Sequence, residues 1–408
     1  MARPGAAAFC SLVALAACGG ETTYEDVFPV LEARCNSCHV DGISTYRPYF
    51  TDYENVALLA RTLRDTVTSR EMPPFGMDNT TRCGNNYFAD EGLWLSDLEL
   101  QTISDWVDDG VPKGSTRDLE GAPRYVEPEL EHVDRTVTTE PYAFTGFDPD
   151  SLHRCFVADP EMEGRAFLSA FEVEPGNRFT VQSVALYAVE DAAAKTAAAA
   201  LDAEDEAPGY SCFGGAAVDG ARFVGTWVWG RRVVRFPAGT GIPLEPDSAM
   251  IIQVHYNSQG GSLHPGEDTT RVHLELVDDA TEAAYVTLSA EGFSLRPGVD
   301  DAIARGFLVV EDPFRILGVA PLMHHSGVQL RVNRVRPFSE TCLAQVNHWE
   351  FYNHLRLFQY LTAPPEVFAG DRLSIECRYE TRHRIEPTLQ GQDPASEQCV
   401  ARLYTVPQ

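Results

Sequence analysis

A chain of 408 residues with 44% hydrophobic residues has room for two or three domains and for ordinary apolar cores, which excludes a disordered protein. The formal net charge of −28 is spread along the sequence, and no cluster of Lys and Arg stands out. Nucleic acid and anionic membrane surfaces are therefore poor partners, and we expect an acidic, solvated surface.

Residues 1–17, MARPGAAAFCSLVALAA, combine an early Arg with an apolar run too short to span a bilayer, as in a secretory signal. The segment ends in LAACG (15–19), which resembles the lipobox of bacterial lipoproteins and implies that Cys18 is lipidated. A plain signal peptide with an incidental cysteine is the alternative. The resemblance implies an outer-membrane lipoprotein that faces the periplasm or the exterior. No later segment reaches about 18 uninterrupted apolar residues, so we expect the acyl chain to be the only membrane attachment.

The stretch CNSCH at residues 35–39 has the spacing C-x-x-C-H, in which two thiols bond covalently to haem and the histidine ligates the iron. Cys35 and Cys38 are thus the expected attachment residues of a haem c, and His39 is the expected axial ligand. A redox C-x-x-C pair and half of a zinc site are the alternatives. The sequence shows no nearby βαβ pattern for the first and no second C-x-x-C for the second.

The residues around this motif resemble a small class I cytochrome c domain, which we expect over residues 18–118. Apolar spacing predicts a helix at residues 25–33, and Ser96 is expected to cap a later packing helix. In domains of this type a methionine beside prolines is the second iron ligand, which implies Met72, with Met77 as the runner-up. Core filling is the alternative role for that methionine. If neither methionine binds, the iron is five-coordinate or bis-His and its potential falls.

Residues 119–150 contain scattered prolines and acidic residues without periodicity, so we expect a linker. From residue 151 onward, short runs of alternating apolar residues separated by Gly, Pro and Asp favour antiparallel sandwiches, one over 151–278 and one over 279–408. The Ala-rich stretch 190–206 is expected to be an inserted surface helix or a mobile loop. The expected fold class is multidomain, with a small all-α cytochrome c domain followed by two all-β jelly-roll-like sandwiches.

Residues 140–408 carry an ordered series of motifs. The series includes HRCFVADP (153–160), EVEPGNRFTVQSVALYAV (172–189), GYSCFGG (209–215), VGTWVWG (224–230), FPAGTGIPL (236–244), IIQVHYN (251–257), GVAPLMHHSGVQLRV (318–332), NHWEF (347–351), AGDRLSIECRY (369–379) and EQCVARLY (397–404). This order resembles the copper type II, ascorbate-dependent monooxygenases, the superfamily of the peptidylglycine hydroxylating and dopamine β-monooxygenases. The resemblance implies two consecutive jelly-roll-like sandwiches with one copper in each.

The resemblance also implies where the first copper would bind. In the family, a His-His pair on one strand and a third histidine in a later Q-V-H-Y stretch hold this metal. Here the pair positions contain Gln182 and Ser183, and only His255 keeps its ligand type.

The second copper of the family takes both histidines of H-x-H and a methionine directly before a cysteine. The matching positions here contain Leu322, His324 and Gln398, so only the second histidine is kept. Copper prefers imidazole and thioether donors. With four of the six ligand positions changed, we expect both copper sites to be lost and copper not to bind.

The opposing interpretation is that nearby donors rebuild one site around His324, with His325, Met323, His348 or His354 as the additional ligands. Adjacent histidines on a strand point to opposite faces, so His324 and His325 would not normally share a metal. Structural histidines satisfied by a neighbouring hydroxyl or carbonyl are the alternative for His255 and His324.

Six cysteines remain after Cys10, Cys18 and the pair in CNSCH are set aside, an even number that suits an oxidising compartment. The family resemblance implies the disulfides Cys155–Cys212 and Cys377–Cys399. Cys83 and Cys342 are then left over. They either form a bridge that joins the cytochrome domain to the C-terminal sandwich or stay free thiols.

These observations leave competing functions. The preferred one is a lipid-anchored, haem-containing electron-transfer protein whose sandwiches serve in binding or docking. The second is a copper type II monooxygenase in which the tethered haem replaces ascorbate as the electron donor. A third is a peroxidase-like haem, which requires Met72 to leave the iron. The expected partner is a redox protein or a small redox carrier, with no nucleic acid.

Overall fold

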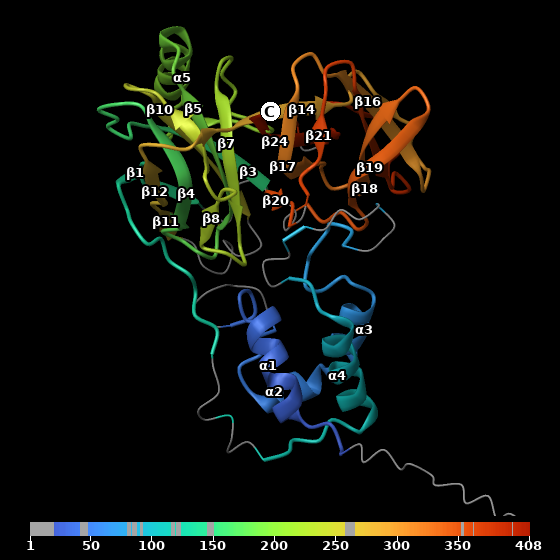
Figure 1. Cartoon of the computed structure of the whole chain (residues 1–408). Coiled ribbons are helices and arrows are strands. Elements are labelled where there is room, and N and C mark those ends of the chain that lie inside the picture. The colour runs from blue at the N-terminus through green and yellow to red at the C-terminus, as the bar shows by residue number, and fades with distance from the viewer. Residues whose placement is uncertain are drawn as a thin grey trace, which may run out of the picture.

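The computed structural model describes residues 20–40, 48–79, 83, 88–89, 93–115, 119, 124–144, 151–257, 266–351, 355–361, 363–393 and 395–408. The expected signal peptide and the expected lipidation site Cys18 lie outside these residues. In Figure 1 an N-terminal helical part lies below two β-rich bodies that stand side by side.

The helical part is built from α1 (Tyr24–Arg34), α2 (Tyr53–Leu58), α3 (Ala60–Thr68) and α4 (Asp97–Asp108). Ser96 caps α4 as expected: its backbone N–H donates to the Glu99 carboxylate at 2.7 Å, and the Glu99 N–H donates to the Ser96 hydroxyl at 3.3 Å. Apolar side chains three or four positions apart on these helices meet in one core. The most deeply buried members include Val27, Leu31, Ile103 and Trp106.

The first sandwich consists of two main sheets. Its strands are β1 (Arg135–Thr138), β2 (Tyr142–Phe144), β3 (Ser151–Ala158), β4 (Ala166–Glu174), β5 (Val181–Val189), β6 (Tyr210–Ser211), β7 (Arg222–Val228), β8 (Val233–Arg235), β9 (Thr240–Leu244), β10 (Ala249–Asn257), β11 (Gly266–Asp268), β12 (Arg271–Val277) and β13 (Thr281–Glu282). One sheet has the order β1-β12-β4-β9-β13, with β8 also paired to β4, and the other has the order β6-β3-β10-β5-β7. In the second of these sheets β10 lies between β3 and β5 and pairs antiparallel with both.

The Ala-rich insertion is a helix, α5 (Ala192–Glu204), rather than a loop. Asp191 accepts the backbone N–H of Ala193 at 2.6 Å and so caps the helix start. Ala194 and Ala198, one turn apart, are buried against the neighbouring strands.

The second sandwich follows directly. Its strands are β14 (Ala284–Ser289), β15 (Ser294–Leu295), β16 (Ala302–Val309), β17 (Phe314–Leu322), β18 (Gly327–Arg336), β19 (Ser339–Val346), β20 (Phe358–Gln359), β21 (Glu366–Val367), β22 (Arg372–Tyr379), β23 (Thr388–Leu389) and β24 (Val400–Pro407). The sheets have the orders β14-β24-β17-β20 and β16-β22-β18-β19, with β21 on the edge of β17 and a separate pair β15-β23.

The first sandwich begins inside the stretch 119–150 that the sequence predicts to be a linker. β1 pairs antiparallel with β12, and β2 pairs with β11. The side chain of Val137 is 2% exposed and that of Phe144 is 1% exposed, so both belong to the sandwich core. Two strands of three and four residues hold too few alternating positions to stand out in the sequence.

The helical part is attached to the second sandwich through residues that follow α3. Phe75, Met77 and Phe88 are buried in the core of that sandwich, where Phe75 packs on Phe358 with ring centroids 5.5 Å apart. The backbone N–H of Asp78 also donates to a sandwich carbonyl at 2.7 Å. Burial of these side chains away from their own helices fixes the two parts relative to each other.

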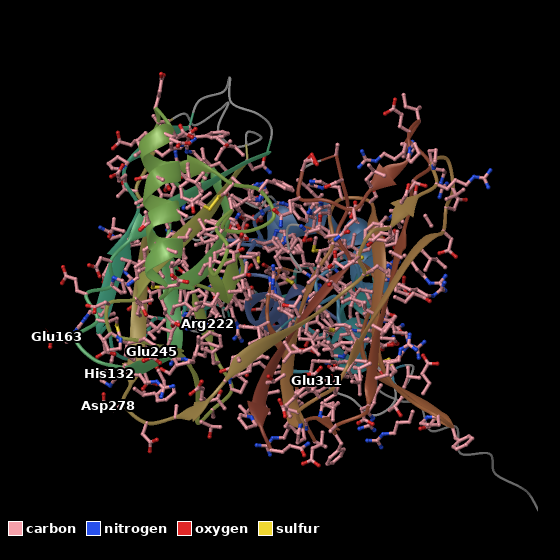
Figure 2. The ribbon with its side chains drawn as sticks, turned by 90° about the horizontal axis from the view of Figure 1, so that it is seen from above. His132, Glu163, Arg222, Glu245, Asp278 and Glu311 are labelled. Atoms are coloured by element: carbon pink, nitrogen blue, oxygen red, sulfur yellow. A yellow bond between two sulfur atoms is a disulfide. The ribbon has the colours of Figure 1, made fainter. Side chains whose placement is uncertain are left out.

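The two sandwiches also share apolar contacts. Tyr404 of β24 stacks on Phe236 of the first sandwich with centroids 5.3 Å apart, and its hydroxyl hydrogen-bonds the Thr240 hydroxyl at 2.9 Å. Figure 2 views both bodies from above, and the acidic side chains Glu163 and Asp278 that it labels are exposed, as the net charge predicts.

Three disulfides are present among the described residues: Cys83–Cys342, Cys155–Cys212 and Cys377–Cys399. The first joins residues 259 positions apart and links the segment after α3 to β19. Of the two possibilities left open for Cys83 and Cys342, the structure therefore has the bridge.

No helix within the described ranges is long and apolar enough to cross a membrane.

Candidate functional site

A small cleft of about 50 Å³ lies between the two sandwiches. Polar and charged side chains in its wall include His153, Ser183, Gln253, His255, His324 and Arg402. The first four come from β3, β5 and β10 of the first sandwich, and the last two come from the second. The cleft therefore contains histidines from both bodies.

His255 lies in the middle of its sheet and has a neighbour on each side. Ser183 of β5 is its partner on one side, and His153 of β3 is its partner on the other. Residues directly opposite each other on neighbouring strands project from the same face. The imidazole rings of His153 and His255 are stacked, with centroids 4.1 Å apart and an angle of 8° between their planes.

Both stacked imidazoles are neutral at neutral pH. Burial, together with smaller effects of the neighbouring His324 and His325, lowers the pKa of His153 to about 3. Burial likewise holds the pKa of His255 well below its ordinary value, with a smaller contribution from His153. Neutral imidazole is the form that binds metal ions.

The Nδ1 atom of His153 is buried and has no hydrogen-bond partner among the described residues. Buried polar atoms are normally satisfied, because an unsatisfied one costs about 1–3 kcal/mol. This orphaned nitrogen is thus an observation that points to a missing ligand.

His324 is held by hydrogen bonds at its ring and its backbone. Its Nδ1–H donates to the carbonyl of Ser396 at 2.9 Å, which leaves the lone pair on Nε2. Its backbone N–H donates to the Glu397 carboxylate at 2.8 Å, and the Trp349 indole donates to its carbonyl at 3.0 Å. Burial lowers the pKa of His324 to about 4, against an opposing effect of the Ser396 hydrogen bond.

Aromatic rings separate the histidines of the two sandwiches. Phe213 makes edge contacts with His153 at 4.5 Å and with His324 at 5.1 Å between centroids. Phe351 packs on His255 at 6.0 Å and on His324 at 5.9 Å. The imidazole rings of both sandwiches are therefore in contact with aromatic side chains.

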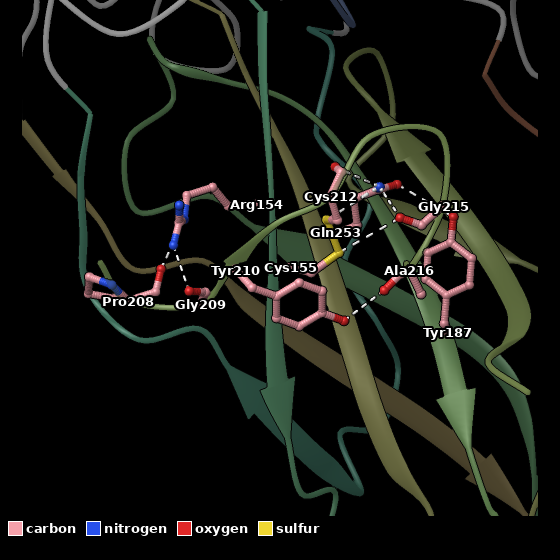
Figure 3. The surroundings of a disulfide bond; sticks show 10 residues. All are labelled: Arg154, Cys155, Tyr187, Pro208, Gly209, Tyr210, Cys212, Gly215, Ala216 and Gln253. Atoms are coloured by element: carbon pink, nitrogen blue, oxygen red, sulfur yellow. Dashed lines mark hydrogen bonds between the residues drawn. A yellow bond between two sulfur atoms is a disulfide. The ribbon is translucent and has the colours of Figure 1, made fainter. Parts of the chain in front are cut away.

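Phe213 belongs to a loop whose neighbouring residues Cys212, Gly215 and Ala216 are bonded to the sheet, as Figure 3 shows for those three residues. Cys212 forms a disulfide with Cys155 of β3. The Gln253 side-chain amide donates to the carbonyls of Gly215 at 2.8 Å and of Cys212 at 3.3 Å. Phe213 follows this disulfide directly, so its position beside His153 is defined by covalent and hydrogen-bonded contacts.

The remaining positions that the family resemblance implies for copper, together with Met323, do not all reach the cleft. Leu322 lines the cleft, whereas Gln182 does not, and Gln398 is buried with its amide next to Gly214. Met323 is fully buried in the core of the second sandwich.

The donors proposed to rebuild a site around His324 do not gather there. His325 is exposed with its ring 4.5 Å from that of Phe351, and His348 is also exposed. His354 lies outside the described residues. His153 lies in the motif HRCFVADP but was not predicted as a donor, because its closeness to His255 depends on the pairing of β3 with β10.

A second, larger cavity of about 300 Å³ lies in the helical part. Its lining contains Cys35, Cys38, His39 and Met72 together with apolar side chains of α3. The Nδ1–H of His39 donates to the carbonyl of Pro48 at 2.8 Å, so the Nε2 lone pair is available. Met77, the runner-up, does not line this cavity.

The two cysteines in this cavity are outside the disulfides. Burial raises the pKa of Cys35 to about 12, with Cys38 adding a smaller rise, and burial raises the pKa of Cys38 as well. Thiol–disulfide exchange needs a thiolate, so these pKa values argue against a redox C-x-x-C pair. Burial lowers the pKa of His39.

Residues 310–407 match the C-terminal domain of the copper type II ascorbate-dependent monooxygenases. The chain is 22% identical over 252 residues to tyramine beta-hydroxylase of Caenorhabditis briggsae, covering 58% of this chain and 41% of that relative. It is 24% identical over 211 residues to DBH-like monooxygenase protein 1 of Homo sapiens, covering 44% of this chain and 32% of the relative. The chain thus spans less than half of the length of these relatives, and its β-rich part is a monooxygenase-like module.

A solved structure, the crystal structure of the infectious bursal disease virus VP2 subviral particle, aligns with 71% of this chain and 76% of its own chain. The identity is 9% and the TM-score is 0.18, which is too low to support any argument.

The comparisons correct the cofactor prediction. The sequence was expected to bind haem c covalently and not to bind copper, but the matching family and relatives are copper monooxygenases, so copper is the supported cofactor. That prediction rested on the residue types at the six ligand positions that the family resemblance implies. That Cys35, Cys38, His39 and Met72 form one binding site stays a prediction.

The side chains at this site are of a type that binds copper. Two neutral imidazoles lie together on β3 and β10, and imidazole is a preferred copper donor. Within the described residues no group of three or more His, Cys, Asp or Glu side chains is close enough to hold a metal ion. The adjacent pair of His153 and His255 is therefore the candidate for holding copper.

Proposed function

We propose that this chain is a copper-dependent oxidoreductase of the monooxygenase type that acts in the cleft between its two sandwiches. The observation that carries the proposal is the pair of neutral imidazoles, His153 and His255, in the wall of that cleft. The match of residues 310–407 and the relatives named as monooxygenases support the same reaction class.

A copper bound in the cleft would supply one-electron chemistry toward dioxygen. The chain's own residues prepare the environment for it. His153 and His255 offer neutral nitrogens, and Phe213 and Phe351 keep water away from them. The hydrogen bonds of His324 hold a third imidazole in place on the opposite wall.

Electron supply is a separate part of the proposal. The N-terminal cavity lies next to the first sandwich, because a Cβ added to Gly230 would be 2.8 Å from the Cys38 sulfur. Gly230 closely follows β7, and Thr226 of β7 lines the cleft. This cavity, lined by Cys35, Cys38, His39 and Met72, would be an electron-entry site by binding a small redox carrier or the redox group of a partner protein, which itself supplies the electrons.

A Cys38→Ser variant tests this electron-entry site. It is expected to keep copper affinity and turnover with added ascorbate, while turnover driven by the redox partner falls at least tenfold. Equal partner-driven turnover in both proteins would remove the site from the proposal.

The proposal places the protein in the cell envelope, where lipidated Cys18 would anchor it to the outer membrane. A Cys18→Ser variant is expected to move from the membrane fraction to the soluble fraction after cell disruption. Unchanged membrane association of that variant would contradict the anchor.

The enzyme proposal is tested by oxygen consumption with ascorbate as the reductant and tyramine as the first substrate probe, since one relative is named for that compound. Extraction of copper with a chelator is expected to stop oxygen consumption, and added copper is expected to restore it. Oxygen consumption that survives complete copper removal would exclude a copper-dependent reaction.

A further inference from the structure

We propose that His153 takes the place of the imidazole missing from β5, so that copper is held from β3 and β10 rather than from β5 and β10. This inference rests on the proposed copper-dependent function, but it concerns metal binding and can be tested without turnover. The three strands involved are neighbours in the order β3-β10-β5.

The register of the sheet makes this exchange possible. His255 on the central strand has Ser183 opposite it on β5 and His153 opposite it on β3. Directly opposed residues have Cβ atoms about 4.5–5.5 Å apart, so a side chain on either flanking strand can approach the same ligand. A donor lost on β5 can therefore be replaced from β3 without any change in the backbone.

The surroundings of the pair argue against an ordinary structural role for His153. A structural histidine uses its ring nitrogens in hydrogen bonds, yet Nδ1 of His153 is buried without such a partner among the described residues. Its ring contacts are the parallel face of His255 and the edge of Phe213, and the Phe213 ring cannot accept a conventional hydrogen bond. Imidazole lone pairs lie in the ring plane, so one of the two stacked rings must turn about its side-chain bonds for both to bind one ion, which would then satisfy the orphaned nitrogen.

His324 on the opposite wall is not part of the inferred copper centre. Phe213 lies between His153 and His324, and the histidines do not form a group of three that could share one ion in the described residues. The inferred centre therefore has two protein imidazoles and leaves other coordination positions open. Open positions are what a metal site needs in order to bind a small reactant.

The test is copper binding to the full chain, measured by competition between the protein and the chromophoric Cu⁺ chelator bicinchoninate. Wild-type protein is expected to bind one equivalent. His153→Ala and His255→Ala are each expected to lose at least tenfold in affinity, and X-ray absorption is expected to show two imidazole nitrogens on copper in the wild type only. His132→Ala is the matched control, because His132 is an exposed histidine outside the cleft.

Two further variants distinguish the loss of a copper ligand from a loss of folding. The double variant His153→Ala/Ser183→His returns an imidazole to β5, and it is expected to recover most of the lost affinity. His153→Asn, which keeps a polar side chain, is expected to bind as weakly as the Ala variant while its near-UV circular dichroism matches the wild type.

Wild-type affinity in the His153→Ala variant would overturn the inference, as would a wild-type chain that takes up no copper. Copper binding as described, but without oxygen consumption, would keep this site and refute only the proposed enzyme activity.

Discussion

The two walls of the cleft differ in how their histidines are used. On the first wall, His153 and His255 stack on neighbouring strands, and one Nδ1 atom has no hydrogen-bond partner among the described residues. On the second wall, His324 is fixed by hydrogen bonds at its ring, its N–H and its carbonyl. The first wall has a ring nitrogen that is available to bind a metal ion, whereas the histidine of the second wall is held by hydrogen bonds to its own sandwich.

This difference shows what the register of neighbouring strands provides. Leu322 on β17 stands opposite Val400 of β24, which offers no metal donor. On the first wall, His255 stands opposite Ser183 of β5 and His153 of β3. Under the proposed copper site, a donor absent from one strand is supplied by its neighbour only where that neighbour carries one in register.

The largest expected change in copper content comes from adding a second histidine to the wall that carries His324. Leu322 lines the cleft two residues before His324 and is 8% exposed. Leu322→His is expected to raise copper uptake from one to two equivalents per chain, measured by elemental analysis after desalting. Leu322→Asn is the control with a polar side chain that is a poor copper donor. A single equivalent in both variants would show that the second wall cannot bind copper even with two imidazoles.

A smaller effect is expected from loosening the turn that holds His324. The Glu397 carboxylate accepts the backbone N–H groups of His324 at 2.8 Å and Ser326 at 2.6 Å. Glu397→Gln replaces one acceptor oxygen by an N–H₂ donor, so we expect a loss of about 1–3 kcal/mol in unfolding free energy by chemical denaturation. Copper affinity is expected to stay unchanged, because the copper pair lies on the other wall. A parallel fall in copper affinity would mean that the walls are not independent.

The smallest expected effect is a difference in pH dependence between the sandwiches. Burial raises the pKa of Asp268 in the first sandwich, although Tyr256 donates to it at 2.9 Å. In the second sandwich the Arg336 guanidinium, hydrogen-bonded at 2.8 Å, lowers the pKa of Asp371.

Because the pKa values of Asp268 and Asp371 shift in opposite directions, the two carboxyl groups change the stability of the folded state with pH in opposite ways. The contribution of Asp268 is present below the ordinary Asp range, near 3.9, and is lost as pH rises through its raised pKa. The contribution of Asp371 is present above that range and is lost as pH falls through its lowered pKa. Denaturation across a pH series is expected to show that Asp268→Asn removes the first dependence and Asp371→Asn the second. Identical pH profiles in both variants would contradict the assignment.

The sequence predicted the parts of this molecule that depend on local patterns. The cap of α4 at Ser96 follows from residue types three positions apart, and the two sandwiches follow from alternating apolar runs. The short strands β1 and β2 escaped notice because three or four residues carry almost no periodic signal.

The candidate site was predicted only in part, for a physical reason. His255 and His324 were found because they match family positions along the chain. His153 lies 102 positions before His255, and only the antiparallel pairing of β3 with β10 brings the two rings together. Donors that meet across strands are set by register, which a single sequence does not reveal.

The most direct test of the account is the copper and iron content of the full chain after exposure to excess copper and desalting. The account predicts one copper per wild-type chain and strongly reduced copper in His153→Ala. A wild-type chain that retains iron but no copper would contradict it.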